Sequence, residues 1–308
     1  MLKDKSKNKP DPWARLFFAL AALSLGFWLI RCAWPEPKLR VTFLDVGQGD
    51  SAVLETSDGA VALADAGPAG ENEADWNAGR RIVVPYLRRR GIRNIDLVFL
   101  THPHSDHVGG MAAVLNAFPA RMVVDIGIPH PSAQYKAFLK AAKLRKASFV
   151  TARRGQMFKL GRYTTIRVLN PPERLFRGTR DDINNNSLVL LVECDQIRIL
   201  LAGDIEAQAE AALLNFVPKI DLLKVPHHGS RFGSTVALLS RCRPQVAVVS
   251  VGRNLFGHPA PETLGRLAFF GAQVLRTDKH GAVTVETNGR RLTVRTMIKP
   301  AATHPRPG

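Results

Sequence analysis

A short histidine-rich stretch, residues 102–107, constrains this chain more than any other feature. The stretch contains His102, His104, Asp106 and His107. It follows the apolar run 95–100, which predicts a buried strand, and it precedes the apolar run 111–115, which predicts a helix. Imidazole and carboxylate groups at this spacing are typical of metal sites, whereas a histidine-rich surface loop is the alternative interpretation. The sequence therefore predicts a metal site at a turn from strand to helix.

The spacing within this stretch divides its side chains between two cations. His102 and His104 are two positions apart, so both can reach one ion from an extended strand end. Asp106 and His107 then turn toward a second ion. The pattern thus indicates a site for two metal ions held close together.

Further motifs follow in a specific order. Residues 43–51 read Phe-Leu-Asp-Val-Gly-Gln-Gly-Asp-Ser, residues 65–67 Asp-Ala-Gly, residues 201–204 Leu-Ala-Gly-Asp, and residues 224–230 Lys-Val-Pro-His-His-Gly-Ser. Together with His-x-His-x-Asp-His, this series resembles the metallo-β-lactamase superfamily. Gly-His-Pro at 257–259 and Arg-Thr-Asp-Lys-His-Gly at 276–281 are similar to the lactamase-like domain of the competence DNA-uptake protein ComEC. The resemblance covers residues 39–296.

This resemblance implies a cofactor of two divalent metal ions, zinc or manganese. His102 and His104 would bind the first ion, Asp106, His107 and His227 the second, and Asp204 would bridge both. Two cations at short separation lower the pKa of water held between them. For Asp204 the alternative role is the N-cap of a helix that begins at residue 205.

Asp106 and His228 are the candidate catalytic residues. His228 adjoins the expected ligand His227, where it is placed to contact a phosphate or to protonate a leaving oxygen. A purely structural hydrogen bond from His228 is the alternative.

The chain departs from the family pattern at the first ion. Lactamase-like enzymes usually supply a third histidine shortly before the strand that leads to the bridging aspartate, but residues 181–187 read Asp-Asp-Ile-Asn-Asn-Asn-Ser. His130 is expected to lie too early in the chain to replace it. Asn186, Ser187 or water would then complete the shell. Such oxygen ligands favour manganese or magnesium more than an all-histidine zinc site would.

Three polar side chains near the first strand are expected to support the site. Residues 46–49 are predicted to turn the chain between two strands, which would place Asp45, Gln48 and Asp50 beside the ligand imidazoles. A plain turn built from glycine and aspartate is the alternative.

The fold class expected is α/β, with a single main domain at residues 39–298. Strands are predicted at 40–44, 52–55, 61–64, 97–100, 122–126, 165–169, 188–192, 197–201, 222–225, 246–251 and 283–286. Helices are predicted at 80–89, 109–117, 133–143, 205–214, 235–241 and 261–270. The family resemblance implies a four-layer αβ/βα sandwich with two mixed sheets. Periodicity alone does not distinguish that layout from a doubly wound sheet.

The N-terminal region is expected to be separate from this domain. A basic tail at residues 1–12 precedes a predicted single-pass transmembrane anchor at 13–34, whose uncharged core is 16–30. A signal peptide and a buried core helix are the alternatives. Lysines before the anchor place the N-terminus in the cytoplasm and the main domain outside it, although basic residues after the anchor weaken this orientation. The final residues 299–308 are expected to be disordered.

A formal net charge of +17 at pH 7 implies a polyanionic partner, either nucleic acid or phospholipid headgroups. No gene-regulatory DNA-binding motif is present, so contacts with DNA are expected to grip a substrate. The sequence does not single out DNA-binding residues or indicate an oligomeric state. Cys194 and Cys242 are expected to be buried thiols.

Three functional hypotheses follow. The first is a membrane-anchored phosphodiesterase or nuclease that acts on DNA during competence-type uptake, with a separate DNA-uptake channel protein as partner. The second is a hydrolase of small esters or lactams with the same fold. The third is a DNA-binding subunit with a weak metal site.

Overall fold

The computed structural model describes residues 11–33, 38–70 and 76–298 of the 308-residue chain. Contacts divide the chain into two units with a boundary between residues 36 and 37. Residues 1–10, Trp34 and 299–308, to which the sequence assigns a basic tail, the end of the anchor and a disordered tail, lie outside the described residues.

The N-terminal unit contains one helix, α1 (Pro12–Ala33), as the uncharged run predicts. Its large apolar side chains are exposed and include Trp13, Leu16, Phe17, Phe18, Leu20, Leu23, Leu25 and Trp28. Across residues 11–33, 38–70 and 76–298, no helix is both long and apolar enough to span a bilayer.

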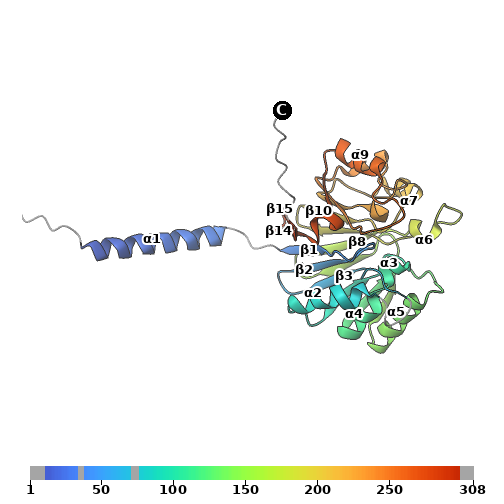
Figure 1. Cartoon of the computed structure of the whole chain (residues 1–308), viewed down its shortest axis with the longest axis horizontal. Coiled ribbons are helices and arrows are strands. Elements are labelled where there is room, and N and C mark those ends of the chain that lie inside the picture. Colours follow the sequence, from blue (N-terminus) through green and yellow to red (C-terminus); the bar gives the residue numbers. More distant parts are fainter. Residues whose placement is uncertain (1–10, 34–37, 71–75, 299–308) are drawn as a thin grey trace, which may run out of the picture. The chain divides into compact units, whose positions relative to one another are not determined.

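The main unit is built around two mixed sheets (Figure 1). The first sheet has eight strands in the order β15-β14-β1-β2-β3-β4-β5-β6. In chain order these are β1 (Leu39–Phe43), β2 (Ala52–Thr56), β3 (Val61–Ala64), β4 (Ile95–Phe99), β5 (Ala120–Asp125), β6 (Ser148–Thr151), β14 (Val283–Thr287) and β15 (Leu292–Thr296). The strands from β3 to β6 are parallel, and the other pairs are antiparallel.

The second sheet has seven strands in the order β13-β12-β11-β10-β9-β8-β7. They are β7 (Met157–Leu160), β8 (Thr164–Asn170), β9 (Val189–Cys194), β10 (Ile197–Leu201), β11 (Leu222–Lys224), β12 (Val246–Val249) and β13 (Gln273–Arg276). The four strands from β10 to β13 are parallel, whereas β7, β8, β9 and β10 pair antiparallel. Each sheet therefore joins an antiparallel part to a parallel part.

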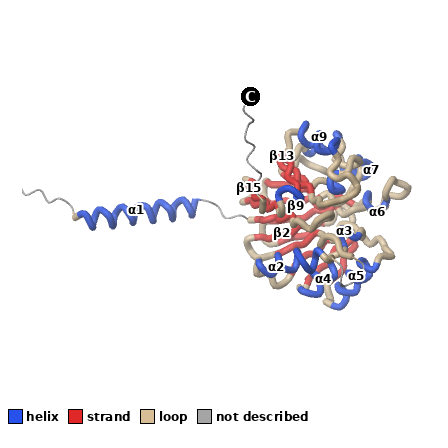
Figure 2. The backbone as a smooth tube through the Cα atoms, viewed as in Figure 1, coloured by secondary structure: helices blue, strands red, loops and turns tan. Residues whose placement is uncertain are grey.

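Helices cover the outer face of each sheet, so the layers run helix, sheet, sheet, helix (Figure 2). The first sheet carries the π-helical turn Gly79–Val83 and the helices α2 (Val84–Arg89), α4 (Met111–Ala117) and α5 (Ala133–Leu144). The second carries α7 (Ala207–Leu213), α8 (Val236–Cys242) and α9 (Pro261–Phe269). The α/β fold with two mixed sheets, which the resemblance implies, is confirmed.

Side chains along each strand point alternately to its two faces, so apolar residues form one core between the sheets and others under the helices. In β4, Leu97 and Phe99 point into the core between the sheets, whereas Val98 packs against the helices outside. Strands buried on both faces are rich in valine, leucine and isoleucine because each face must pack against an apolar layer. Cys194 and Cys242 are free and buried, as predicted.

The main differences from the predicted elements occur at the sheet edges and in short helices. The sequence missed β6, β7, β13 and β15, all of which are edge strands. It also missed the short helices α3 (Ser105–Val108), α6 (Asp182–Asn185) and α10 (Thr277–His280). Helix α7 begins at Ala207 with Glu206 as its N-cap residue, so the alternative of Asp204 as an N-cap is wrong.

Close backbone approach beside the histidine-rich turn requires glycine. A Cβ on Gly110 would lie 2.1 Å from the carbonyl oxygen of Ala66 and 2.5 Å from the amide nitrogen of Gly79. These neighbours are main-chain atoms, so they cannot rotate away as a side chain can. Gly110 therefore allows the loop after β3 to pack against the start of α4.

We expect Gly110→Ala to lower the free energy of unfolding by at least ~1–3 kcal/mol, because the added methyl group displaces backbone. The matched control is Gly265→Ala inside α9, where a Cβ meets no atom within 4 Å. That change should be neutral or stabilise the protein by up to ~0.5–1 kcal/mol. Urea denaturation measures both, and equal stability of the two variants would contradict this packing.

Candidate metal centre

The histidines and carboxylates of the candidate site meet at the carboxyl ends of parallel strands. Asp65 follows β3, residues 102–107 follow β4 and enter α3, and Asp204 follows β10. His227 and His228 follow β11, in the short 3-10 turn Pro226–Gly229. Parallel neighbours end at the same edge of a sheet, so loops far apart in the sequence converge there.

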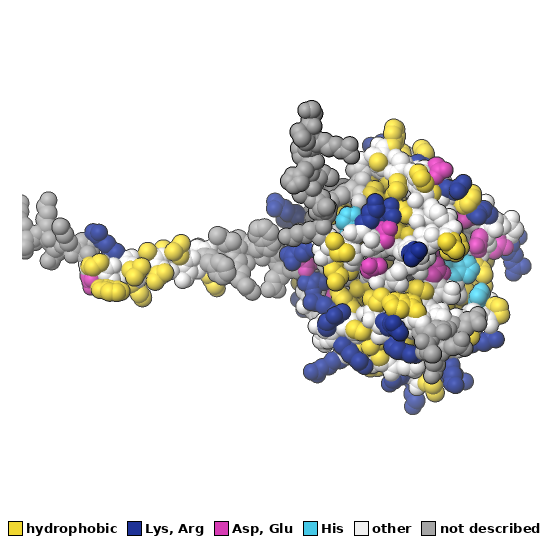
Figure 3. Space-filling view, viewed as in Figure 1, with side chains coloured by type: hydrophobic (Ala, Val, Ile, Leu, Met, Phe, Trp, Pro, Cys, Tyr) yellow, Lys and Arg dark blue, Asp and Glu magenta, His cyan; other side chains and the backbone are white. Residues whose placement is uncertain are grey.

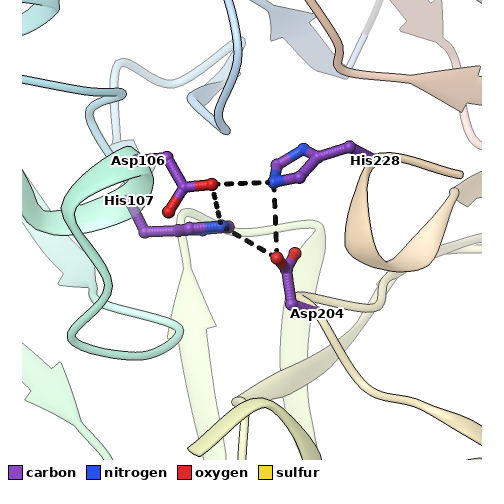
Figure 4. Close-up of side chains that lie close together, drawn as sticks. All are labelled: Asp106, His107, Asp204 and His228. Carbon is purple, nitrogen blue, oxygen red and sulfur yellow. Dashed lines mark hydrogen bonds and ion pairs between the residues drawn. The ribbon is translucent and has the colours of Figure 1, made fainter. Parts of the chain in front are cut away.

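Four of these side chains form one compact group. Ligand atoms of Asp106, His107, Asp204 and His228 all lie within 4.8 Å of one another (Figure 4). His228 Nε2 is 3.1 Å from Asp106 Oδ2 and 3.3 Å from Asp204 Oδ2. His107 Nε2 is 3.3 Å from Asp204 Oδ2. Two imidazoles and two carboxylates thus point at one small volume.

Hydrogen bonds fix the two imidazoles in this orientation. His228 Nδ1 donates to the carbonyl oxygen of Ser250 at 2.9 Å, and His107 Nδ1 donates to Asp65 Oδ2 at 2.8 Å. The Asp65 carboxylate is held in turn by the amide and hydroxyl of Thr101, at 2.8 and 2.7 Å. Both Nε2 atoms therefore face the group, which is the usual arrangement of metal-binding histidines.

A buried ion pair lies behind the group. Lys224 Nζ contacts Asp50 Oδ2, donates to the carbonyl oxygen of Gly203 at 3.2 Å, and lies 3.7 Å from Asp204 Oδ1. Asp50 Oδ1 is also 3.5 Å from His228 Nδ1. Burial opposes the charge on the lysine, but the Asp50 and Asp204 carboxylates raise its pKa above the ordinary value. Lys224 is therefore a fixed positive charge among carboxylates.

When no cation is bound, the carboxylates of the compact group are negatively charged and its two imidazoles are positively charged. Burial opposes ionisation of Asp204, yet His228 and His107 hold the pKa of Asp204 well below its usual range. Burial likewise disfavours protonated His228, but Asp204 and Asp106 raise the pKa of His228 to about 10. Burial also disfavours protonated His107, but the same carboxylates, with Asp65, raise the pKa of His107 well above its usual value. Protons on the two imidazoles therefore balance the carboxylates.

The two histidines predicted for the first ion lie together beside this group. His102 Nε2 is 3.1 Å from His104 Nδ1, and the His102 ring centre is 4.1 Å from that of His107. Burial, followed by repulsion from His107, keeps the pKa of His102 well below its usual value, so this imidazole is neutral. His130 lies nearer than the sequence suggests, with its ring centre 6.1 Å from that of His104.

The asparagine run places Asn184 beside the site, whereas the predicted residues Asn186 and Ser187 make other contacts. Asn186 binds backbone groups of Phe176 and Asp182, and Ser187 Oγ accepts a hydrogen bond from the Asp204 amide. Both side chains are thus engaged in loop structure. Asn184 instead faces the site, with Nδ2 3.5 Å from His227 Nε2 and a buried Oδ1 that makes no hydrogen bond among the described residues.

The two neighbouring histidines in the turn after β11, His227 and His228, lie differently with respect to the compact group. His228 belongs to the compact group, whereas His227 Nε2 lies 4.0 Å from Asp204 Oδ2 and His227 Nδ1 lies 3.3 Å from Glu206 Oε1. The His227 side chain is 21% exposed, against 2% for His228. Both residues have positive φ angles, 49° and 51°, which set the two rings in different directions.

The turn after β1 supports the site through Asp50 alone among the three predicted residues. Asp45 is exposed and its carboxylate accepts the Gly47 amide at 3.4 Å, so it belongs to the turn itself. Gln48 Oε1 accepts the Gly252 amide at 3.3 Å, which fixes the turn to the loop after β12. Neither side chain reaches a ligand imidazole, so for Asp45 and Gln48 the structure matches the alternative of a plain turn.

Sequence reasoning missed several side chains of the site. Asp65, Thr101 and Lys224 orient or balance the ligands, and half-buried His258 lies against His227 with ring centres 5.2 Å apart. Burial, followed by repulsion from His227 and His228, lowers the pKa of His258 to about 4. The motifs at 65–67 and 224–230 contained the signal for Asp65 and Lys224.

Unpartnered buried atoms provide a test of whether a cation fits. His107 Nε2, Asp204 Oδ1 and Asn184 Oδ1 are buried and make no hydrogen bond within the described parts of the chain. Buried polar atoms normally find partners, and orphaned ones need an explanation such as an ion. Imidazole nitrogen and carboxylate oxygen suit zinc and manganese. The donor set therefore fits a divalent metal ion.

Comparison with known proteins agrees with this geometry. The family model described as the metallo-beta-lactamase superfamily matches residues 44–253. The chain belongs to the metallo-beta-lactamase superfamily. The matched segment includes Asp65, the histidine-rich turn, Asp204, and both histidines of the turn after β11.

Curated relatives of this superfamily member include competence proteins. Recombination protein 2 of Haemophilus influenzae is 32% identical over 96% of this chain and 35% of its own length. ComE operon protein 3 of Bacillus subtilis is 29% identical over 81% of the chain and 33% of its own. Competence protein ComA of Neisseria gonorrhoeae is 30% identical over 88% of the chain and 35% of its own length. The chain spans about a third of these relatives' length, and the resemblance to the ComEC lactamase-like domain is confirmed.

Solved structures share the fold at low identity. Igni18, a metallo hydrolase from Ignicoccus hospitalis, is 18% identical with a TM-score of 0.50 and covers 80% of this chain and 98% of its own. CmlA, a diiron β-hydroxylase from Streptomyces venezuelae, is 12% identical with a TM-score of 0.50. The match covers 80% of this chain and 54% of CmlA. The superfamily fold is therefore shared with metal-dependent proteins.

We expect His228→Ala to lose metal and His227→Ala to retain it, because His228 completes the compact group. The loss of metal affinity in His228→Ala should exceed ~10- to 100-fold, which is the range for removing a residue that only orients a ligand. Metal content after dialysis, measured by mass spectrometry, checks both variants. Retention by His228→Ala and loss by His227→Ala would restore the assignment made from sequence.

Proposed function

We propose that this metallo-beta-lactamase family member is a metal-dependent phosphodiesterase that cleaves DNA. The convergence of Asp106, His107, Asp204 and His228 on one volume carries the proposal. Divalent ions bound there would polarise a phosphoryl oxygen and activate water as a nucleophile. Membership of the superfamily, and the shared fold of the metallo hydrolase Igni18, support hydrolysis as the reaction type.

Within this proposal the side chains have distinct roles. Asp106, His107, Asp204 and His228 would hold one divalent ion, and His102 and His104 would help to hold a second, with Asn184 nearby. Asp65 and the pair Asp50–Lys224 are positioning residues, because they act through the ligands.

His227 takes the role that the sequence gave to His228. It is partly exposed at the rim of the group, so it is placed to contact a phosphoryl oxygen or to give a proton to the leaving oxygen. Its Nδ1 faces the buried Glu206 carboxylate, which orients the ring.

Charge and relatives support DNA as the substrate. The chain has a net charge of +17, and Lys and Arg side chains are spread over the visible face of the main unit (Figure 3). Such a surface attracts a phosphodiester polyanion without reading its bases. Two relatives are named for competence or its operon and one for recombination, which favours DNA over a small ester.

We expect His104→Ala and Asp204→Asn to reduce hydrolysis of DNA and of bis(p-nitrophenyl) phosphate by at least roughly 100-fold, because metal ions contribute several kcal/mol to such reactions. Asp195→Asn is the matched control, since Asp195 pairs with Lys38 at an exposed turn. Manganese- or zinc-loaded protein is assayed.

Three results would replace this proposal. Full activity in both ligand variants would remove the site from the reaction. Efficient hydrolysis of nitrocefin or a thioester with DNA left intact would identify a small-substrate hydrolase. Metal-independent DNA binding by the wild type without cleavage of either diester would identify a binding subunit.

We further propose that the N-terminal segment attaches the protein to a membrane, with the main unit outside the cytoplasm. The exposed apolar side chains of α1 support attachment. Lysines at positions 3, 5, 7 and 9 support a cytoplasmic N-terminus. An external hydrolase would meet incoming DNA near a separate channel protein.

For this attachment we expect the full chain to sediment with membranes of an expression host and residues 38–308 alone to lose that association. Protease added to intact spheroplasts should digest the main unit. Protection until lysis would reverse the orientation, and membrane binding by the truncated chain would assign attachment to the main unit.

A further inference from the structure

A pocket of about 380 Å³ adjoins the metal centre on the second sheet's side. Its walls come from the start of α7, from the loop 231–235 and the first residue of α8, from Arg266 on α9, and from Arg180 just before α6. Pockets of roughly 300–1,000 Å³ commonly bind small organic groups. The volume therefore suits one unit of a larger substrate.

The lining combines apolar surface with positive charge. Phe232 and Val236 are 42% and 58% exposed, although large apolar side chains usually pack inside. The Arg180 guanidinium lies 3.5 Å from the centre of the Phe232 ring. Arg231 is exposed, and its side chain makes no ion pair with any residue that the structure describes. An aromatic ring with flanking arginines suits a nucleobase and its phosphate.

One buried carboxylate joins this pocket to the metal centre. Glu206 Oε1 lies 3.2 Å from Arg180 Nη1 and 3.3 Å from His227 Nδ1. The Glu206 side chain is only 2% exposed, so its charge is directed at these two partners and away from solvent. A ligand in the pocket would consequently meet the arginines, and its neighbouring unit would lie at His227.

The aromatic side of the pocket is held rigidly. Arg266 donates to the carbonyl oxygens of Gly233 and Ser234, each at 2.8 Å, and the buried Glu210 carboxylate accepts the Thr235 amide at 2.8 Å. The Ala207 amide donates to the Phe232 carbonyl oxygen at 3.0 Å. A surface fixed before binding loses little conformational entropy when its ligand arrives.

We propose that this pocket is a subsite for one nucleotide of a single-stranded nucleic acid, next to the scissile phosphodiester; this rests on the proposed function. The base stacks against the pair that Arg180 and Phe232 form, and Arg231 contacts a flanking phosphate. In a duplex both faces of each base are already covered, so the pocket selects an unpaired strand.

The binding test uses the full, metal-loaded chain and a fluorescent phosphorothioate oligothymidylate, which resists hydrolysis. Phe232→Ala should weaken binding roughly 5- to 100-fold, the range for losing one stacked base. Phe149→Ala on β6 is the matched control, because Phe149 is 45% exposed and packs against Phe138 on the first sheet's helical side. Equal affinities of these two variants would overturn the subsite.

Salt dependence tests the phosphate contact separately. Arg231→Ala should reduce the magnitude of the slope of log affinity against log salt by about 0.7, the value for one phosphate contact on a single strand. Arg89→Ala, at the exposed end of α2, should leave the slope unchanged. An unchanged slope for Arg231→Ala would remove the phosphate contact from the subsite.

Cleavage assays distinguish failure of the subsite from failure of the proposed function. If the pocket binds a nucleotide as proposed, Phe232→Ala will lose more activity on oligothymidylate than on bis(p-nitrophenyl) phosphate. Equal losses on both substrates would overturn the subsite while leaving phosphodiesterase activity in place. A wild-type protein that binds oligothymidylate through Phe232 but cleaves neither substrate would overturn the proposed function alone.

Discussion

The structure depends on four carboxylates crowded between the carboxyl ends of its two sheets. Asp50, Asp65, Asp106 and Asp204 lie close together, and all except Asp106 are almost fully buried. Like charges at such separations destabilise each other in a poorly solvated site unless cations compensate. His107, His228 and Lys224 supply that compensation. The charges come from loops of both sheets, so the site is complete only where the two sheets pack together.

The same electrostatics prepares the site for metal. Protons on His107 and His228 balance the carboxylates in the metal-free protein, and a divalent ion at the Nε2 atoms would replace them. Affinity for metal consequently rises with pH. Lys224 does not occupy the metal position, because its ammonium group is paired with Asp50 behind the group. The fold thus keeps the Lys224 ammonium group apart from the position where a metal ion would bind.

The inner strands and the grouping of the histidine-rich turn with Asp204 could be predicted from the sequence, whereas edge strands and the choice between adjacent side chains could not. The edge strands β6, β7 and β15 are partly exposed, so they lack the continuous apolar runs that mark β4 or β10. His227 and His228 are adjacent in one short turn and share left-handed backbone angles, so the local sequence does not show which ring faces the group. Asn184 and Asn186 likewise differ by their positions on α6 and the residue after it. Such choices are made by tertiary contacts, which residue spacing does not encode.

Anomalous diffraction from crystals of the manganese-loaded protein tests the central claim most directly. It locates the ion without relying on activity. A manganese peak enclosed by Asp106, His107, Asp204 and the Nε2 atom of His228 is the predicted result. A peak bound by His227 in place of His228, or the absence of a peak beside Asp204 in crystals that contain manganese elsewhere, would contradict it.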